Sequence, residues 1–257
     1  MRTSDALIIR TVDFSETSRI VTAFTQQYGK IEALAKGGLR LKSPFEASLD
    51  MLAVNSVTYI PKRSDALDLL TESKLLHRFS ISPFNLAGSF AGHYVAELVN
   101  AFTQTDDAQP ALYDLALNVL KCLEEGTFVM RTLVRFEGNL LHLTGYFPSL
   151  RRCVDCNAAV ERTAERRIMF ALMHSGVLCP HCAAGQSHTV SIRADSLNTL
   201  ERLIDPRDKD GHWKKTPISR NVSGEIRSLL NRYISHCLGY RPKLYDWFRL
   251  IAELDNA

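Results

Sequence analysis

Short apolar runs that alternate with polar positions dominate the first 80 residues of the chain. The runs are rich in Val, Ile, Thr and aromatic residues, and glycine or proline punctuates the intervals between them. They read ALIIRTV, RIVTAFTQQYG, KIEALAKGG, DMLAVNSVTYIPKR and ALDLLTESKLL. This pattern predicts five β-strands. Five strands are the number in an OB-type barrel, although SH3-like barrels have similar numbers. We therefore predict that residues 1–80 form a five-stranded OB-type β-barrel.

After residue 81 the spacing of apolar residues becomes helical. Phe90, Tyr94, Leu98 and Phe102 recur every four residues, which places them on one face of an amphipathic helix. The same kind of pattern is repeated further along the chain, over residues 110–126, 128–143, 195–204 and 223–239. Residues 81–257 are thus predicted to form an α-helical domain, and the whole chain to be a multi-domain α+β protein.

Two close pairs of cysteines interrupt the helical part, in a knuckle predicted over residues 150–185. Cys153 and Cys156 form one CxxC, Cys179 and Cys182 form the other, and 22 residues separate the pairs. Four thiolates in two such pairs are a typical tetrahedral zinc set, because the two-residue gap lets both sulfurs of a pair face one ion. A shell of four protein thiolates leaves no position for a reactive water, so we expect this zinc to be structural.

Other readings of the cysteines stay open. One of the nearby histidines could replace a cysteine as ligand; they are His174, His181 and His188. An iron–sulfur cluster is also compatible with four thiolates, although two knuckles suit zinc better. A thioredoxin-like redox role is disfavoured, because no βαβ pattern surrounds either pair. Cys122 and Cys237 fall on apolar helix stripes and are expected to be small core residues.

Composition and charge narrow the class of protein. The 257 residues are 46% hydrophobic and 23% charged, as in ordinary folded proteins. No apolar run approaches the roughly 20 residues of a membrane span, and the first residues do not resemble a signal peptide. We expect a cytoplasmic protein without a membrane partner.

The net charge is only +3, but four basic residues lie close together in the sequence around a single acid, Glu32; they are Lys30, Lys36, Arg40 and Lys42. On charge alone, such a patch is more often a solvated loop than a binding site.

A search for catalytic motifs finds none. The chain has no Walker-type phosphate loop, no GxGxxG after a strand, no GxSxG and no HExxH. Its eight histidines are scattered. A binding protein, and not an enzyme, is therefore expected.

Four stretches of the sequence resemble one known family. Near the N-terminus, the chain carries T-x-x-x-G-K at residues 25–30 and A-K-G-x-x-R-x-K-S at residues 35–43. Further along come LVRFEGNLLHLTGYFPSLRRCVDC and GVLCPHC, and then LLNRYISHCLGYRPKL. In this order, and across nearly the whole chain, these motifs are similar to those of the RecO family of bacterial DNA repair and recombination mediators.

The resemblance implies a fold, a function and partners. RecO proteins have an N-terminal OB-fold, a helical domain and, in many members, a zinc site. They bind single- and double-stranded DNA and promote strand annealing. With RecR they help to load RecA on single-stranded DNA coated by single-stranded-DNA-binding protein (SSB), in the RecF pathway. RecF and RecA would be indirect partners, and the protein would act at the nucleoid.

The resemblance also gives the basic patch more weight. On an OB barrel, Lys30, Lys36, Arg40 and Lys42 would lie at a strand end and in the loop after it, where they could guide a phosphate backbone. Arg19 and Arg10 are second candidates for DNA binding. The aromatic residues of this region could stack on bases, but are more often core in so small a barrel; they are Phe14, Phe24 and Tyr28.

Two alternative functions belong to other classes. In one, the knuckle and the acidic helices grip a partner protein, and the barrel binds DNA weakly or not at all. In the other, the chain is a nucleic-acid enzyme whose active site assembles from residues distant in sequence. Metal-dependent turnover of DNA or nucleotide would reveal such an enzyme.

Overall fold

The architecture comes from a computed structural model of the chain. It describes residues 1–40, 43, 45, 48–62, 66–80, 85–126, 128–163, 166–208 and 211–247. Lys42, one of the predicted DNA-binding residues, lies outside these ranges. The chain divides into two compact units, residues 1–129 with 246–257 and residues 130–245. The helices that follow the barrel are thus shared between the units, and a domain boundary at residue 80 stays a prediction.

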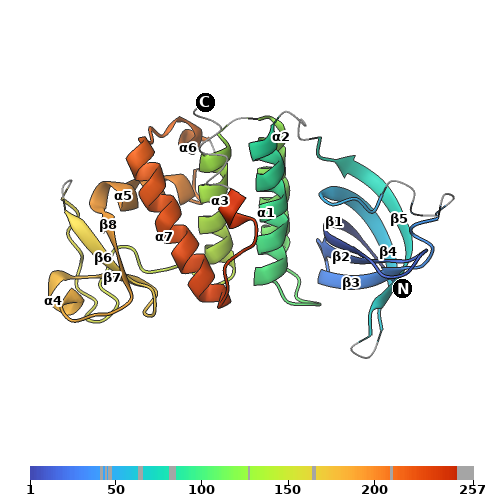
Figure 1. The fold of residues 1–257 in the computed structure, drawn as a ribbon, viewed down its shortest axis with the longest axis horizontal. Helices are drawn as coiled ribbons and strands as arrows, with labels where there is room; N and C mark the ends of the chain where they lie inside the picture. Colours follow the sequence, from blue (N-terminus) through green and yellow to red (C-terminus); the bar gives the residue numbers. More distant parts are fainter. Residues whose placement is uncertain are drawn as a thin grey trace. The chain divides into compact units, whose positions relative to one another are not determined.

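The first unit contains a closed barrel of five strands (Figure 1). The strands are β1 (Arg2–Asp13), β2 (Arg19–Thr25), β3 (Gly29–Ala35), β4 (Ala53–Ile60) and β5 (Asp68–Arg78). Their order around the barrel is β1-β2-β3-β5-β4, and β4 pairs with β1 to close it. The contact between β3 and β5 is parallel and the others are antiparallel. The predicted α+β fold with an N-terminal OB-type barrel is confirmed.

Alternate residues of the strands fill the barrel. Side chains from every strand are buried there; they include Ala6, Ile8, Val21, Ala23, Ile31, Ala33, Ala35, Val57, Tyr59 and Leu70. In β1 the alternation changes at Ile9, because the pairing with β2 skips this residue between Ile8 and Arg10. Such a β-bulge shifts the following side chains to the other face of the strand. Arg10 is therefore exposed on the outside of the barrel, paired with Thr22.

Two helices of the first unit pack against part of the outer surface of the barrel. They are α1 (Leu86–Phe102) and α2 (Pro110–Glu124). The Asn85 side chain accepts a hydrogen bond from the backbone N–H of Gly88 and caps α1, whereas α2 begins at a proline. Phe24 points out of the barrel and its ring lies 6.1 Å from that of Tyr113 on α2. One outer face of the barrel is thus part of the hydrophobic core of the unit.

The second unit combines helices with a small sheet. Its elements are α3 (Val129–Leu143), β6 (Arg167–Ala171), β7 (Gly176–Leu178), α4 (Pro180–Ala183), β8 (Thr189–Arg193), α5 (Ala194–Ile204), α6 (His212–Lys215) and α7 (Arg220–Leu238). The helices α3, α5 and α7 agree with the predicted helical segments. The antiparallel sheet β7-β6-β8 was not predicted, because strands of three to five residues are too short to show a period. Phe170 of β6 packs edge-on against Tyr233 of α7, with ring centres 5.4 Å apart, and so joins the sheet to the helices.

Within the described ranges, none of the helices is both long and apolar enough to cross a bilayer.

Candidate metal centre and nucleic-acid interface

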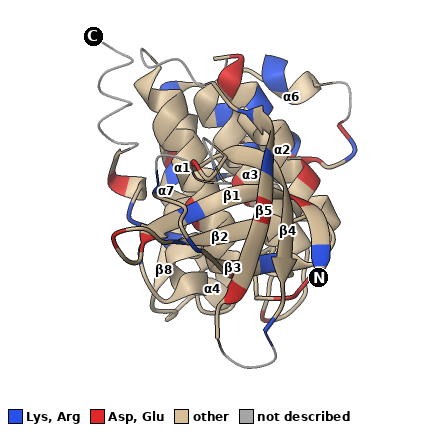
Figure 2. Cartoon of the chain, turned by 90° about the vertical axis from the view of Figure 1, so that its right-hand side faces the viewer, with Lys and Arg blue, Asp and Glu red and all other residues tan. Residues whose placement is uncertain are grey.

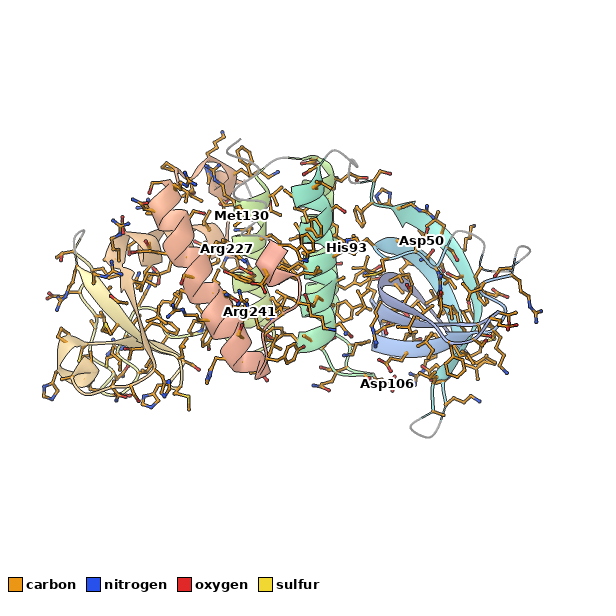
Figure 3. The ribbon with its side chains drawn as sticks, viewed as in Figure 1. Asp50, His93, Asp106, Met130, Arg227 and Arg241 are labelled. Carbon is orange, nitrogen blue, oxygen red and sulfur yellow. The ribbon has the colours of Figure 1, made fainter. Side chains whose placement is uncertain are left out.

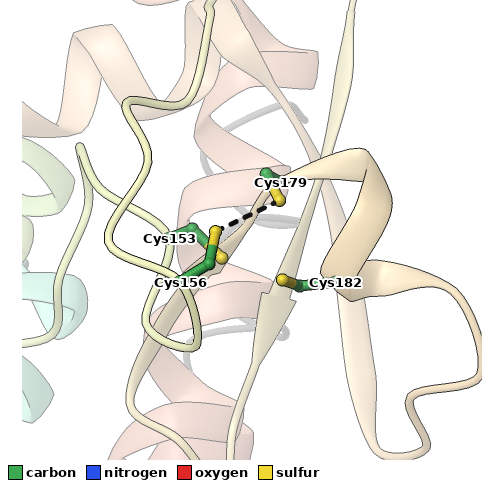
Figure 4. A group of neighbouring side chains, drawn as sticks. All are labelled: Cys153, Cys156, Cys179 and Cys182. Carbon is green, nitrogen blue, oxygen red and sulfur yellow. Dashed lines mark hydrogen bonds between the residues drawn. The ribbon is translucent and has the colours of Figure 1, made fainter.

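The two cysteine pairs converge on one point in the second unit. The sulfur atoms of Cys153, Cys156, Cys179 and Cys182 all lie within 4.8 Å of one another (Figure 4). The Sγ atoms of Cys156 and Cys179 are 3.7 Å apart. A tetrahedral zinc ion with Zn–S bonds of about 2.3 Å requires sulfur atoms about 3.8 Å apart. The four thiols could thus hold one metal ion, and the spacing fits zinc.

Local backbone turns hold each pair in this position. After the first pair, the N–H of Asn157 donates to the carbonyl of Cys153, and Asn157 has a φ of 60°. The second pair straddles the start of α4, where Pro180 follows Cys179 directly. The closed turns aim both sulfurs of each pair at the same point, as the two-residue spacing predicts.

The strand β7 presses directly against the first cysteine turn. A Cβ atom on Gly176 would lie 2.5 Å from Cγ1 of Val154 and 2.6 Å from the carbonyl oxygen of Ser149. Only glycine fits there, since real Cβ contacts are never so short. The N–H of Val154 also donates to the carbonyl of Val177, at 3.0 Å. These contacts hold the turn of Cys153 and Cys156 against β7, which leads directly into the second cysteine pair.

The electrostatics of the site favour a thiolate at Cys153, which is only 2% exposed. Burial by itself raises the pKa of this thiol, but backbone N–H groups of Cys179, Cys156 and Asp155 surround its sulfur and bring the pKa down to about 6. Hydrogen bonds with the thiols of Cys179 and Cys156 raise the pKa of Cys182. A divalent cation would take up the negative charge of all four sulfurs and displace the remaining protons.

Polar residues around the four cysteines form hydrogen bonds that hold the surrounding loops, and they do not belong to the cysteine cluster. His174, an alternative ligand from the sequence, instead has its Nδ1 2.8 Å from a carboxylate oxygen of Asp155. The nearly buried Arg162 donates to the carbonyl of Leu150 and to the carboxylate of Glu201 on α5. The loop before the first cysteine is thereby tied to a helix. If all four thiolates bound one ion, its coordination shell would have no open position for a substrate.

The predicted DNA-binding residues of the barrel do not form one cluster. Lys30, on β3, is turned towards α1, where its Nζ donates to the carbonyl of Asn100 at 2.7 Å. Burial lowers the pKa of this ammonium group. Its backbone carbonyl also accepts from the N–H of Asp106. Lys30 thus connects the barrel to the helical part of its own unit.

Lys36 and Arg40 lie at a different place, in the turn that follows β3. Both are exposed. The N–H of Leu39 donates to the carbonyl of Thr17 at 3.1 Å, so this turn lies against the β1–β2 loop. Gly37, with a φ of 73°, allows the chain to reverse between the two basic residues.

Arg19 lies on β2 and Arg10 on β1, and the two residues differ in their surroundings. Arg19 pairs with Ala35 in the sheet, and its Nε donates to the carboxylate of Asp13 at 2.9 Å, which neutralises its charge. Arg10 has no carboxylate within ion-pair distance in the described part of the chain, and the same holds for Lys36 and Arg40. Figure 2 shows basic and acidic segments intermingled on the strands of the barrel that face the viewer.

The three aromatic residues of this region have different environments. Phe24 is fully buried against α2, and Tyr28 packs against the barrel core. Phe14, the first residue of the β1–β2 loop, is 61% exposed. The expectation that these residues are core holds for Phe24 and Tyr28 and is wrong for Phe14. Exposure next to a turn cannot be read from residue type, so the sequence carried no signal for it.

Comparison with known proteins gives a consistent result along the chain. The model for the N-terminal region of recombination protein O matches residues 1–79, and the model for its C-terminal region matches residues 83–245. The DNA repair protein RecO of Rhodopirellula baltica is 38% identical over 271 residues, which cover 98% of this chain and 99% of that protein. The protein of the same name from Symbiobacterium thermophilum is 31% identical over 232 residues, covering 90% and 89%. Two matched regions that span the barrel and the cysteine site show that the chain belongs to the RecO family of DNA repair and recombination proteins.

Proposed function

We propose that this protein is a non-catalytic recombination mediator that binds single- and double-stranded DNA through its barrel and promotes annealing of complementary strands. With RecR it helps to load RecA on single-stranded DNA coated by SSB, at the nucleoid. The observation that carries the proposal is the basic end of the barrel. There Lys36 and Arg40 project from one turn beside the β1–β2 loop, without carboxylate partners in the described residues.

The contacts at this end suit the DNA backbone better than they suit bases. Lysine and arginine side chains bind phosphates of any sequence, and the described strands offer few amide groups that could read a base edge. Lys30, which is held by the carbonyl of Asn100, is not part of the proposed contact surface. Arg19, paired with Asp13, contributes less charge than its position suggests. Binding is therefore expected to be electrostatic and independent of sequence.

The proposed role of the cysteine site is to stabilise the second unit with a zinc ion. Cys153, Cys156, Cys179 and Cys182 supply the ligands, and the closed shell supports a scaffold rather than a reaction. Metal analysis of the purified protein would separate zinc from the iron that a cluster would contain.

Replacement of the two basic residues of the turn tests the DNA site. The variant Lys36→Ala with Arg40→Ala is expected to bind single-stranded DNA roughly tenfold more weakly at physiological salt, because each lost phosphate contact removes about 0.7 from the slope of log K against log salt. On duplex DNA the slope should fall by about 0.9 for each contact. Fluorescence anisotropy with labelled oligonucleotides at several salt concentrations measures both quantities.

A matched control removes the same charge elsewhere in the first unit. Lys74 on β5 and Lys121 on α2 are exposed and lie outside the turn. Lys74→Ala with Lys121→Ala should leave the salt slope almost unchanged. Equal weakening by both double variants would show that only net charge matters, and would remove the DNA site from the turn.

Annealing of two complementary fluorescent oligonucleotides tests the activity itself. We expect faster annealing without ATP, also on strands coated with SSB, and a loss of this effect at high salt. If the folded protein neither binds DNA nor anneals it, the proposal fails and a protein-interaction factor becomes the better description. Turnover of labelled DNA or nucleotide in the presence of a metal ion would instead indicate an enzyme.

A further inference from the structure

The outer surface of the barrel carries an apolar strip next to its basic turn. Val12 of β1 pairs with Ile20 of β2, and Ile20 pairs with Leu34 of β3. Their neighbours Val21 and Ala35 belong to the barrel core, so the three side chains point outwards. Val12 is 39% exposed, and Ile20 and Leu34 are half-buried. This apolar strip lies at the opposite end of β2 from Phe24, which packs on α2.

Phe14 stands at one end of the apolar strip, in the β1–β2 loop two residues beyond Val12. Its backbone is held, because its N–H donates to the carbonyl of Ser18 at 2.9 Å. The bond between Leu39 and Thr17 fixes the same loop against the basic turn. These bonds fix the position at which the Phe14 ring meets solvent. Burying an exposed aromatic ring against a ligand is favourable, because it removes apolar surface from water.

Cations flank the apolar strip on two sides. Arg10 lies two residues before Val12, and the bulge at Ile9 turns it to the outer face. Lys36 lies two residues beyond Leu34 and is exposed. The acid Glu32 shares this face, paired with Thr22, but it is separated from Phe14 by the whole strip. An apolar surface with an aromatic ring and neighbouring cations is complementary to single-stranded nucleic acid, because the bases can stack on the ring and the phosphates can bind the cations.

We propose that the apolar strip and Phe14 bind unpaired bases of single-stranded DNA while Arg10 and Lys36 contact its phosphates. This inference rests on the proposed function and adds a preference to it. Bases of a duplex are stacked inside the helix and cannot reach the ring, whereas each base of a single strand offers a flat face. Phe14 is thus the residue that distinguishes single from double strands, and the cations bind both.

The test compares Phe14→Ala with the unchanged protein on three probes of equal charge: a single-stranded oligonucleotide, the same oligonucleotide with abasic sites, and a duplex. Loss of one stacking contact should weaken binding of the single strand by roughly tenfold. Affinity for the duplex and the salt slope should not change, because no phosphate contact is lost. The abasic strand should bind the unchanged protein about as weakly as the normal strand binds Phe14→Ala, with no further loss when both changes are combined.

Two further variants keep the result interpretable. Phe14→Trp should retain single-strand binding, and its fluorescence should change when the intact strand binds. Tyr240→Ala removes an equally exposed ring from the second unit and should have no effect. Thermal unfolding of Phe14→Ala should match that of the unchanged protein, since the ring is exposed.

The outcomes separate this inference from the proposed function. If Phe14→Ala binds all three probes normally while Lys36→Ala with Arg40→Ala binds them weakly, the base-binding role is overturned and the DNA-binding function stands. Equal losses on the single strand and the duplex would also overturn it, because the ring would then support the backbone contacts. If the unchanged protein binds none of the probes, both proposals fail.

Discussion

Replacing Cys153 or Cys179 by serine is expected to release the metal ion and to destabilise residues 130–245. Metal binding to four thiolates contributes about 10 to 16 kcal/mol in small zinc domains, where nothing else holds the fold. Here the sheet β7-β6-β8 also packs on α7 through Phe170 and Tyr233, so part of the structure should survive. We expect a loss of about 3 kcal/mol or more, which for a unit of this size lowers the Tm by roughly 10 °C or more. Calorimetry combined with metal analysis measures both effects.

Cys122 provides the matched control for this substitution. It lies on α2 in the first unit, far along the chain from the four convergent thiols, and Cys122→Ser should keep the metal content unchanged. A chelator should reproduce the effect of Cys153→Ser in the unchanged protein and have little effect on that variant. A Cys153→Ser protein of normal stability that has lost only its annealing activity would contradict the structural role and point to metal chemistry.

Patterns with a short period made most of the fold predictable. The strands of the barrel alternate over seven residues or more, and the long helices repeat an apolar stripe, so both appear in the sequence. The four cysteines were recognisable as a candidate metal site for a similar reason, since two cysteines with two residues between them can share one turn. The strands β6, β7 and β8 were missed because three to five residues contain too few alternations.

What the sequence could not show depends on partners distant in the chain. Lys30 belongs to the basic run around residue 36, but a carbonyl 70 residues away binds its ammonium group. Arg10 would face the barrel interior if alternation continued, and a bulge at Ile9 reverses it. Phe14 in the β1–β2 loop and Phe24 on β2 are the same residue type, yet one is exposed to solvent and the other packs against Tyr113. Only the assembled fold decides which of these residues DNA can reach.

A buried ion pair in the second unit leads to the other large expected effect. Glu137 of α3 is completely buried, and Arg227 of α7, which is nearly so, donates a hydrogen bond to its carboxylate. Arg227, which is labelled in Figure 3, also lies over the ring of Tyr245, with its Cζ 5.3 Å from the ring centre, and the Tyr245 hydroxyl donates to the carbonyl of Arg227. The pair thus joins three segments that are distant in sequence.

Glu137→Gln is expected to destabilise the second unit by about 3 to 5 kcal/mol, because it leaves the guanidinium buried without its counter-charge. Replacing both members, as Glu137→Met with Arg227→Met, should recover much of this loss, since no charge of the pair then remains in the interior.

The exposed pair of Asp205 and Arg207 is the control. Arg207 lowers the pKa of Asp205 to about 2, yet solvent screens this pair, and Asp205→Asn should change the free energy of unfolding far less than Glu137→Gln does. Urea unfolding of the four proteins gives the comparison. If Glu137→Gln proved as mild as Asp205→Asn, the pair would be solvated in solution and would not hold α3 to α7.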